Sequence, residues 1–286
     1  MNKTACSNAV KLAFDKYRTF KGMASGNPII FLHGLLGNKL NNRATGKHLS
    51  RTLNKDVYCL DLRNHGASPH NPNHDYQSMA QDVECFIRDN HVKQPIIIGH
   101  SMGAKVAMSL ALRNAKTCSM LISVDNVPTP NTGNDVTVEI LKFEKYLNVL
   151  REAFTDPKVS LKSVDSRLQL VEPSKKVRTF LMSNIKKDYG SGEVYCRIPI
   201  DILYRNIYKI FDFPYQRDVF NGPSLFIRGT ESHFVHDTDE EAIQARFPQY
   251  RIENIKAGHW IISENPQKFN ETVKRFIWEN EKYCSA

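Results

Sequence analysis

One serine has the surroundings of a nucleophile. Ser101 is the centre of Gly99-His100-Ser101-Met102-Gly103, a G-x-S-x-G pentapeptide. The apolar run 95–98 before it is typical of a buried strand in a parallel sheet, and residues 104–112 after it favour a helix. A sharp turn between strand and helix holds the hydroxyl above the sheet edge and requires small residues at its first and last positions. The pentapeptide alone could be a helix start capped by Ser101, but its flanks favour a nucleophile elbow.

A histidine near the C-terminus is the candidate general base. Residues 250–255 alternate like a strand, residues 256–260 interrupt the pattern, and residues 269–279 favour a closing helix. His259 therefore lies on a loop after the last expected strand, where a histidine that follows nucleophile and acid along the chain takes the serine proton. Alone it would be read as a surface loop residue, but together with Ser101 it is predicted to be catalytic.

Two backbone N–H groups could stabilise a negatively charged oxygen. The loop His33-Gly34-Leu35-Leu36-Gly37-Asn38 follows the expected strand 28–32. In a strand–elbow–helix architecture such a loop offers one N–H, and the residue after the nucleophile offers the other. Leu35 and Met102 are assigned to these roles by position only, and the alternative for the loop is a plain glycine-rich turn.

The carboxylate that would orient His259, the acid of the catalytic set, is harder to identify from the residues alone. It usually follows the next-to-last strand, here 223–227, about three residues past the glycine that ends it. In this chain that position is Ser232, which is not an acid. Glu231 is adjacent, but a shift of one residue points a loop side chain elsewhere.

Asp125 is the favoured acid. It ends the expected strand 120–124, and its carboxylate can reach His259 because parallel strands end at the same edge of a sheet. The alternative for Asp125 is an ordinary structural role, as a turn or cap residue before Pro128. The less favoured candidates for the acid are Glu231, Asp237 and Asp239.

Three stretches resemble one branch of the α/β-hydrolases. They are Asp61-Leu62-Arg63-Asn64-His65-Gly66-Ala67-Ser68-Pro69-His70, residues 99–105, and Val124-Asp125-Asn126 followed by Pro128. The branch holds the yeast ethanol acetyltransferases, mitochondrial abhydrolase-domain esterases and small bacterial esterases with a helical cap. The resemblance extends over nearly the whole chain, from an expected first strand beginning near Val10 to the final helix.

This resemblance implies an α/β-hydrolase fold, with a mostly parallel central sheet flanked by helices. It implies the triad Ser101, Asp125 and His259, because in this branch the acid follows the strand after the elbow and a serine stands at the usual acid position. It also implies acyl groups carried as esters or as acetyl-CoA. Relatives are often mitochondrial. The first nine residues hold Lys3 as their lone charge and give no convincing transit peptide, so the alternative location is cytoplasmic.

A helical insertion is expected between the strand ending at Asp125 and the strand at Leu225. The predicted core is residues 1–129 with 217–286, and the predicted cap is residues 130–216. Within the cap, apolar residues recur at helical spacing. They are Ile140, Phe143, Leu147 and Leu150, followed by Val177, Leu181 and Ile185. A cap over the nucleophile would exclude water from the reaction.

Composition excludes several other classes of protein. The 286 residues suffice for one large α/β domain, and no apolar run approaches the length of a membrane span. The six cysteines are scattered without metal-ligand spacing, which predicts a reducing compartment and no metal site.

The net charge of +9 is spread through the chain rather than gathered in a stripe, which argues against a nucleic-acid partner. The densest cationic cluster is a solvated helix face or, alternatively, a rim that attracts the phosphates of CoA. It comprises Lys175, Lys176, Arg178, Lys186 and Lys187.

The pattern as a whole predicts a serine acyltransferase that needs no cofactor. By resemblance, it makes acetate esters such as ethyl acetate from acetyl-CoA and a small alcohol, with esterase and thioesterase side activities. The alternative is a plain carboxylesterase or thioesterase that uses water as the acceptor. A non-catalytic ligand-binding protein is a third class, but its sign would be loss of Ser101 or His259, and both are present.

Overall fold

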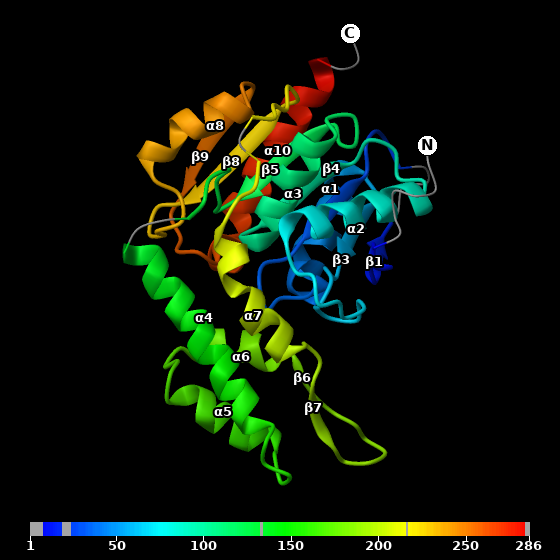
Figure 1. Cartoon of the computed structure of the whole chain (residues 1–286). Coiled ribbons are helices and arrows are strands. Elements are labelled where there is room, and N and C mark those ends of the chain that lie inside the picture. Colours follow the sequence, from blue (N-terminus) through cyan, green and yellow to red (C-terminus); the bar gives the residue numbers. More distant parts are fainter. Residues whose placement is uncertain (1–7, 19–23, 132–133, 216, 284–286) are drawn as a thin grey trace.

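A seven-stranded sheet organises the chain (Figure 1). The structure is a computed structural model that describes residues 8–18, 24–131, 134–215 and 217–283. The order of the strands is β1-β3-β2-β4-β5-β8-β9, and only the β1–β3 pair of this sheet is antiparallel. The strands are β1 (Phe14–Tyr17), β2 (Ile29–Leu32), β3 (Val57–Leu60), β4 (Ile96–His100), β5 (Met120–Val124), β8 (Ser224–Gly229) and β9 (Tyr250–Ile255).

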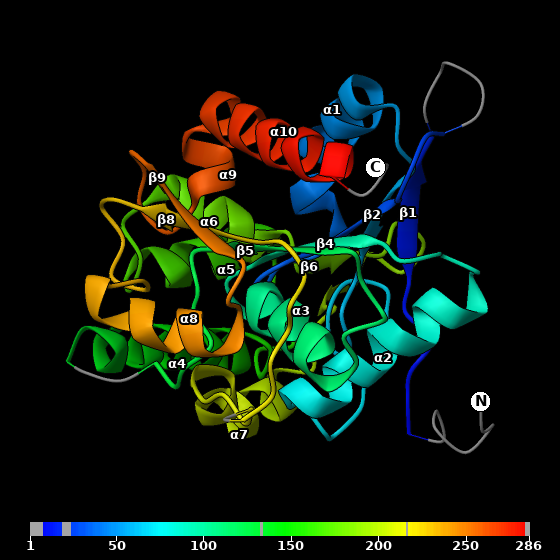
Figure 2. The same cartoon turned by 90° about the horizontal axis from the view of Figure 1, so that it is seen from above.

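Helices cover both faces of this sheet (Figure 2). One face carries α1 (Arg43–Leu53), α9 (Ile261–Glu264) and α10 (Pro266–Tyr283). The other carries α2 (Tyr76–Asp89), α3 (Met102–Arg113) and α8 (Glu240–Arg246). Strands β2 to β5 are buried along their whole length, which explains their continuous apolar sequences without polar alternation.

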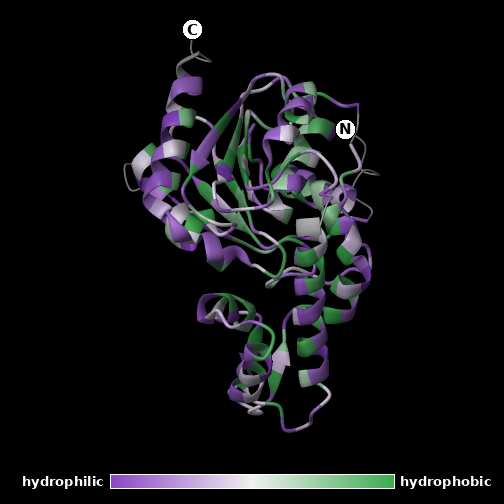
Figure 3. Cartoon of the chain, turned by 90° about the vertical axis from the view of Figure 1, so that its left-hand side faces the viewer, coloured by the Kyte–Doolittle hydropathy of each residue, from purple (hydrophilic) through white to green (hydrophobic). Residues whose placement is uncertain are grey.

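Alternation within a strand divides the core into two layers. Ile30 and Leu32 of β2 pack with the cluster around α2 and α3, whereas Ile29 and Phe31 pack with the cluster around α1 and α10. Successive strand side chains point to opposite faces, so one four-residue strand contributes to both layers. In Figure 3 the strands at the centre of the molecule are correspondingly hydrophobic.

The prediction for the first strand is wrong in its start. The strand begins at Phe14 rather than near Val10. Before it, the Val10 N–H donates to Asp82 Oδ1 (2.8 Å) and the Ala13 N–H donates to Ser68 Oγ (2.9 Å). Side chains thus take these two N–H groups, although the Ala13 carbonyl oxygen still accepts from the Asp61 N–H (2.8 Å). Hydrophobic periodicity does not reveal this arrangement.

The segment between β5 and β8 is mainly helical and projects beyond one edge of the sheet (Figure 1). It contains α4 (Asn134–Ala153), α5 (Leu161–Gln169), α6 (Lys175–Met182) and α7 (Ile200–Phe211). A small antiparallel hairpin of β6 (Ile185–Lys187) and β7 (Val194–Cys196) separates α6 from α7. The helical spacing assigned to Ile185 is therefore wrong, because this residue pairs with Cys196 in the hairpin. The domain limits at residues 130 and 216 stay a prediction.

The cysteines only partly follow expectation. Cys59, Cys118 and Cys196 are free, and burial raises the pKa of Cys59 to about 12. Cys85 is disulfide-bonded, which a reducing compartment does not favour. Among the described residues, no helix is both long enough and apolar enough to span a membrane.

Candidate active site

Ser101 lies in a constrained turn between β4 and α3. Its backbone has φ 54° and ψ −119°, a conformation that side-chain-bearing residues rarely adopt. A Cβ atom at Gly99 would lie 2.1 Å from the Gly103 carbonyl oxygen, and one at Gly103 would lie 2.6 Å from the Leu32 carbonyl oxygen. Both glycines are therefore required sterically, and the strand, turn and helix expected around the serine are all present.

A chain of hydrogen bonds joins the three residues proposed from sequence. His259 Nε2 lies 2.9 Å from Ser101 Oγ, and His259 Nδ1 lies 2.7 Å from Asp125 Oδ2. An ionised carboxylate only accepts hydrogen bonds, so Asp125 places the ring proton on Nδ1 and leaves Nε2 free to accept the serine proton. Asp125 is fully buried, and Ser101 is 9% exposed. This geometry suits proton abstraction from the serine hydroxyl.

The carboxylate is fixed by two further donors. The Gly229 N–H donates to Asp125 Oδ1 (3.1 Å), and Ser232 Oγ donates to Asp125 Oδ2 (2.5 Å). Ser232 stands at the position where the acid is usually found, and its hydroxyl here supports the acid supplied by β5. Sequence reasoning noted the serine but missed this bond.

Among the described residues, none of the competing acids pairs with His259. Glu231 is exposed, and within the described residues its side chain makes no hydrogen bond to His259, while the Asp237 carboxylate pairs with Arg228. Asp239 Oδ2 accepts from the His236 N–H (2.8 Å). The geometry therefore brings Asp125, rather than these three, to the histidine.

Two aromatic rings hold His259 in place. The Phe234 ring stacks on the imidazole with a centroid distance of 4.0 Å and an interplanar angle of 21°. His100 Nε2 lies 2.8 Å from the His259 carbonyl oxygen, so this nitrogen carries the proton and donates it. Burial first, and then the neighbouring His259, lower the pKa of His100 to about 4. His100 therefore stays neutral, as this tautomer requires.

The loop expected to contribute to an oxyanion hole passes close to the serine. A Cβ atom at Gly34 would lie 3.2 Å from Ser101 Cβ. Within the described part of the chain, neither the Leu35 N–H nor the Met102 N–H donates to another residue. Met102 is the first residue of α3, where the helix dipole also favours negative charge. Both N–H groups are thus available to a ligand.

Buried histidines brace that loop against the stretch after β3. His33 Nε2 accepts from the Leu62 N–H (3.0 Å), and His65 Nε2 accepts from the Leu36 N–H (3.1 Å). Burial lowers the pKa of His33 and of His65, and it lowers the pKa of His74 to about 3. The neutral rings can accept these hydrogen bonds. They therefore tie the loop after β2 to the histidine-containing stretch after β3.

Ser101 and His259 open on a cavity of about 790 Å³. Its walls come from the loop after β2, the start of α1, helix α6 and the turn after His259. The residues that line it include Leu35, Asn42, Thr45, Phe143, Lys176, Val177, Phe180, Trp260, Ile262 and Glu264. Phe180 packs edge-on against Trp260 with a centroid distance of 4.5 Å, so the inserted segment contacts the loop that carries the histidine.

The cationic cluster, expected as a solvated helix face or alternatively as a rim for CoA, is divided between α6 and β6. Lys176 lines the cavity, but the Arg178 side chain is mostly buried and pairs with Asp165 at 3.0 Å. Lys187 lies on β6 and does not line the cavity. Among these cations, only Lys176 is in a position to meet a ligand bound beside Ser101.

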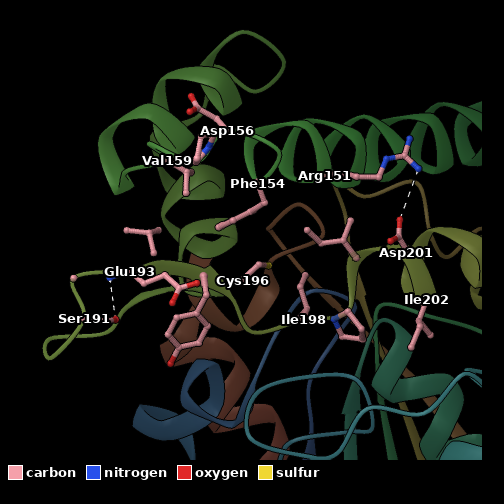
Figure 4. Close-up of a pocket in the computed structure, with 16 residues that line it drawn as sticks. Arg151, Phe154, Asp156, Val159, Ser191, Glu193, Cys196, Ile198, Asp201 and Ile202 are labelled. Atoms are coloured by element: carbon pink, nitrogen blue, oxygen red, sulfur yellow. Dashed lines mark hydrogen bonds and ion pairs between the residues drawn. The ribbon is translucent and has the colours of Figure 1, made fainter.

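A second cavity of about 850 Å³ lies within the inserted segment (Figure 4). It is bounded by the end of α4, the start of α7 and the β6–β7 hairpin, and Arg151 pairs across it with Asp201 at 3.9 Å. Neither Ser101 nor His259 lines it. The proposed chemistry therefore concerns the first cavity.

Known proteins share both the sequence pattern and the fold. The profile of the family described as alpha/beta hydrolase fold matches residues 27–266. A "Probable alcohol acetyltransferase" of Saccharomyces cerevisiae is 40% identical over 272 residues, covering 89% of this chain and 78% of the relative. The mouse "sn-1-specific diacylglycerol lipase ABHD11" is 32% identical over 262 residues, covering 91% of this chain and 84% of the relative. The solved structure of a "Marine microorganism esterase" superposes with a TM-score of 0.84 at 30% identity, covering 94% of this chain and 100% of that one.

The buried neutral histidines predict a specific loss of stability in acid. An unfolded His74 binds a proton below pH 6.5, whereas the folded residue resists protonation until about pH 3. Its contribution to stability is complete above pH 6.5 and is lost as the pH falls, costing about 2 kcal/mol at pH 5. Urea unfolding of His74→Gln at pH 7.5 and pH 5 should show a pH-dependent loss smaller than the wild-type loss by about that amount. An equal loss in both proteins would contradict this assignment.

Proposed function

The chain is an enzyme of the α/β-hydrolase family, and on that premise we propose that Ser101, His259 and Asp125 form its catalytic triad for acyl transfer. The observation that carries this proposal is the continuous hydrogen-bonded chain from the Ser101 hydroxyl through His259 to the buried Asp125. We therefore set aside a non-catalytic ligand-binding role.

Acylation begins with proton transfer from Ser101 Oγ to His259 Nε2 as the oxygen attacks the substrate carbonyl. The negative charge on the carbonyl oxygen is stabilised by the N–H groups of Leu35 and Met102. Asp125 stabilises the imidazolium, which then gives its proton to the departing alcohol or thiol. The product is an acyl ester of Ser101.

Deacylation repeats these steps with an acceptor hydroxyl. His259 takes the acceptor's proton, the acceptor oxygen attacks the acyl carbonyl, and Ser101 recovers its proton. We propose a small alcohol as acceptor and acetyl-CoA as donor, so that the product is an acetate ester such as ethyl acetate. This choice rests on the family resemblance and on the name of the yeast relative. Residues 130–216 would act as a cap, because α6 and Phe143 line the cavity beside Ser101. A mitochondrial location rests on the family resemblance alone.

Hydrolysis of neutral esters is the second candidate. The charged side chains that line the cavity are Lys176 and Glu264, whose opposite charges offset each other. The phosphates of CoA carry several negative charges that favour cationic partners. This balance favours an uncharged acyl donor, in keeping with the lipase and esterase names of two similar proteins.

Product analysis separates these candidates. Purified protein is incubated with acetyl-CoA in the presence and absence of ethanol, and separately with neutral short-chain esters, while ethyl acetate, free acetate and released thiol are quantified. Ethyl acetate formation that requires ethanol is the expected result. Acetate alone would indicate a thioesterase, and hydrolysis of neutral esters without use of acetyl-CoA would replace acetyl transfer by the second candidate.

The identity of the acid has its own test. Asp125→Asn should reduce kcat by on the order of 10³–10⁴-fold, because the amide no longer fixes the His259 tautomer or stabilises its charge. Glu231→Gln serves as the matched control and should reduce kcat by less than about tenfold, since surface carboxylates away from the reacting atoms contribute little. Both variants are compared at equal folded fraction, measured by thermal unfolding. The reverse ranking would return the acid to the loop after β8.

A further inference from the structure

The loop that carries the Leu35 N–H turns through a residue in an unfavourable conformation. The Gly37 N–H donates to the Gly34 carbonyl oxygen (3.0 Å), which closes a four-residue turn with Leu35 and Leu36 at its centre. Leu36 has φ 60°, a left-handed conformation that is usually left to glycine at this position of a type II turn. A leucine keeps such a conformation only where its surroundings hold the backbone in place.

Two buried side chains hold Leu36, one on each side of its Cα atom. The Leu36 N–H donates to His65 Nε2 (3.1 Å), and the Leu36 carbonyl oxygen accepts from Asn184 Nδ2 (2.7 Å). Leu36 and His65 are fully buried, and Asn184 is only 2% exposed. The two bonds fix the peptide planes before and after Leu36. Together with the closed turn, they set the direction of the Leu35 N–H.

The donor to the Leu36 carbonyl oxygen comes from the inserted segment. Asn184 lies between α6 and β6, and its own carbonyl oxygen accepts from the Arg197 N–H (2.8 Å), just after β7. A second bond joins the same two parts of the chain, because Asn38 Nδ2 donates to Ser183 Oγ (3.2 Å). The inserted segment is therefore bonded directly to the loop after β2.

The end of helix α6 does not require the Asn184 side chain. Asn184 Nδ2 also donates to the Leu181 carbonyl oxygen (3.3 Å), but that oxygen already accepts from the Asn184 backbone N–H (3.1 Å). The Leu36 carbonyl oxygen has no other donor among the described residues. The bond to Leu36 is thus the one that depends on the Asn184 side chain.

We propose that Asn184 is a positioning residue for the oxyanion hole, because it holds the Leu36 carbonyl so that the Leu35 N–H points toward the oxyanion formed when Ser101 attacks. The inference rests on the proposed acyl-transfer function and gives the inserted segment a part in it beyond excluding water. Oxyanion stabilisation depends on donors that are in place before the charge develops. Without Asn184, the buried Leu36 carbonyl oxygen lacks a partner, which favours a different turn and a misplaced Leu35 N–H.

The kinetics of Asn184→Leu test this role. Leucine is similar in size but has no donor, so it removes the bond to Leu36 without leaving space for a water molecule that could replace it. With para-nitrophenyl acetate as substrate, kcat/KM should fall roughly 10–100-fold. This is a large part of the about 10²–10³-fold loss that follows removal of a whole oxyanion donor.

A pair of ketones separates positioning from a general disturbance of the cavity. Trifluoromethyl butyl ketone forms the oxyanion, because Ser101 Oγ adds to its carbonyl carbon, the serine proton passes to His259, and the carbonyl oxygen becomes negatively charged. Methyl butyl ketone binds without this step. Asn184→Leu should raise the inhibition constant of the trifluoromethyl ketone by the same factor by which it lowers kcat/KM. The inhibition constant of the methyl ketone should change by less than about twofold.

Asn206→Leu is the matched control. Asn206 lies on α7 and is also buried, and its Nδ2 donates to the Pro72 carbonyl oxygen (3.3 Å) and to the Ile202 carbonyl oxygen (2.8 Å). Like Asn184, it joins the inserted segment to a loop of the core and to its own helix, but that loop follows β3. The control should keep kcat/KM and both inhibition constants within about threefold of the wild-type values, because the turn at Leu36 is unchanged.

Thermal unfolding midpoints verify that each protein is folded, and Asn184→Ala, which removes the donor without adding bulk, replaces Asn184→Leu if the latter does not fold. An unchanged kcat/KM in the folded Asn184 variant, or an equal loss of affinity for both ketones, would overturn the positioning role. Ester turnover that depends on Ser101 would then leave the acyl-transfer proposal standing. Absence of such turnover in the wild-type protein would instead refute the acyl-transfer proposal, and the positioning role with it.

Discussion

The close approach of backbone at Gly99 and Gly103 is the constraint on which the candidate site depends. Ser101 keeps an unfavourable φ of 54° because β4 and α3 on either side of it are buried and cannot relax independently. A backbone conformation of this kind costs on the order of 1–3 kcal/mol, which the packing of the surrounding core offsets. In return, the hydroxyl is held clear of the sheet, within hydrogen-bond distance of His259.

The position of the acid follows from strand adjacency. His100 of β4 pairs with Val124 of β5, so Asp125 leaves the sheet directly beside the turn that holds Ser101. Strand β8 lies on the far side of β5, and from there Gly229 and Ser232 donate to the carboxylate. A carboxylate on β5 thus occupies the place where β8 usually delivers one. The serine hydroxyl at the usual position fits this arrangement, because a second carboxylate would repel Asp125.

Long apolar runs in the sequence were enough to predict the buried strands. Very short strands, and most hydrogen bonds between residues far apart in the chain, could not be predicted in this way. Apolar runs such as 95–98 and 120–124 mark buried parallel strands, and the shared edge of their ends makes Asp125 a reasonable choice from sequence position alone. The hairpin at Ile185 escaped prediction because three-residue strands have no measurable period. The hydrogen bond between Ser232 and Asp125 joins residues 107 positions apart, and no local pattern predicts such a contact.

The central claim is that acyl groups pass through a covalent ester of Ser101, and trapping that ester tests it most directly. Protein is mixed with an activated acetate ester, quenched in acid during turnover, digested, and its peptides are weighed by mass spectrometry. The account predicts one acetyl group on the peptide that contains Ser101, absent from the Ser101→Ala protein treated identically. Turnover without any acetylated Ser101, or the same labelling in the Ser101→Ala protein, would contradict it.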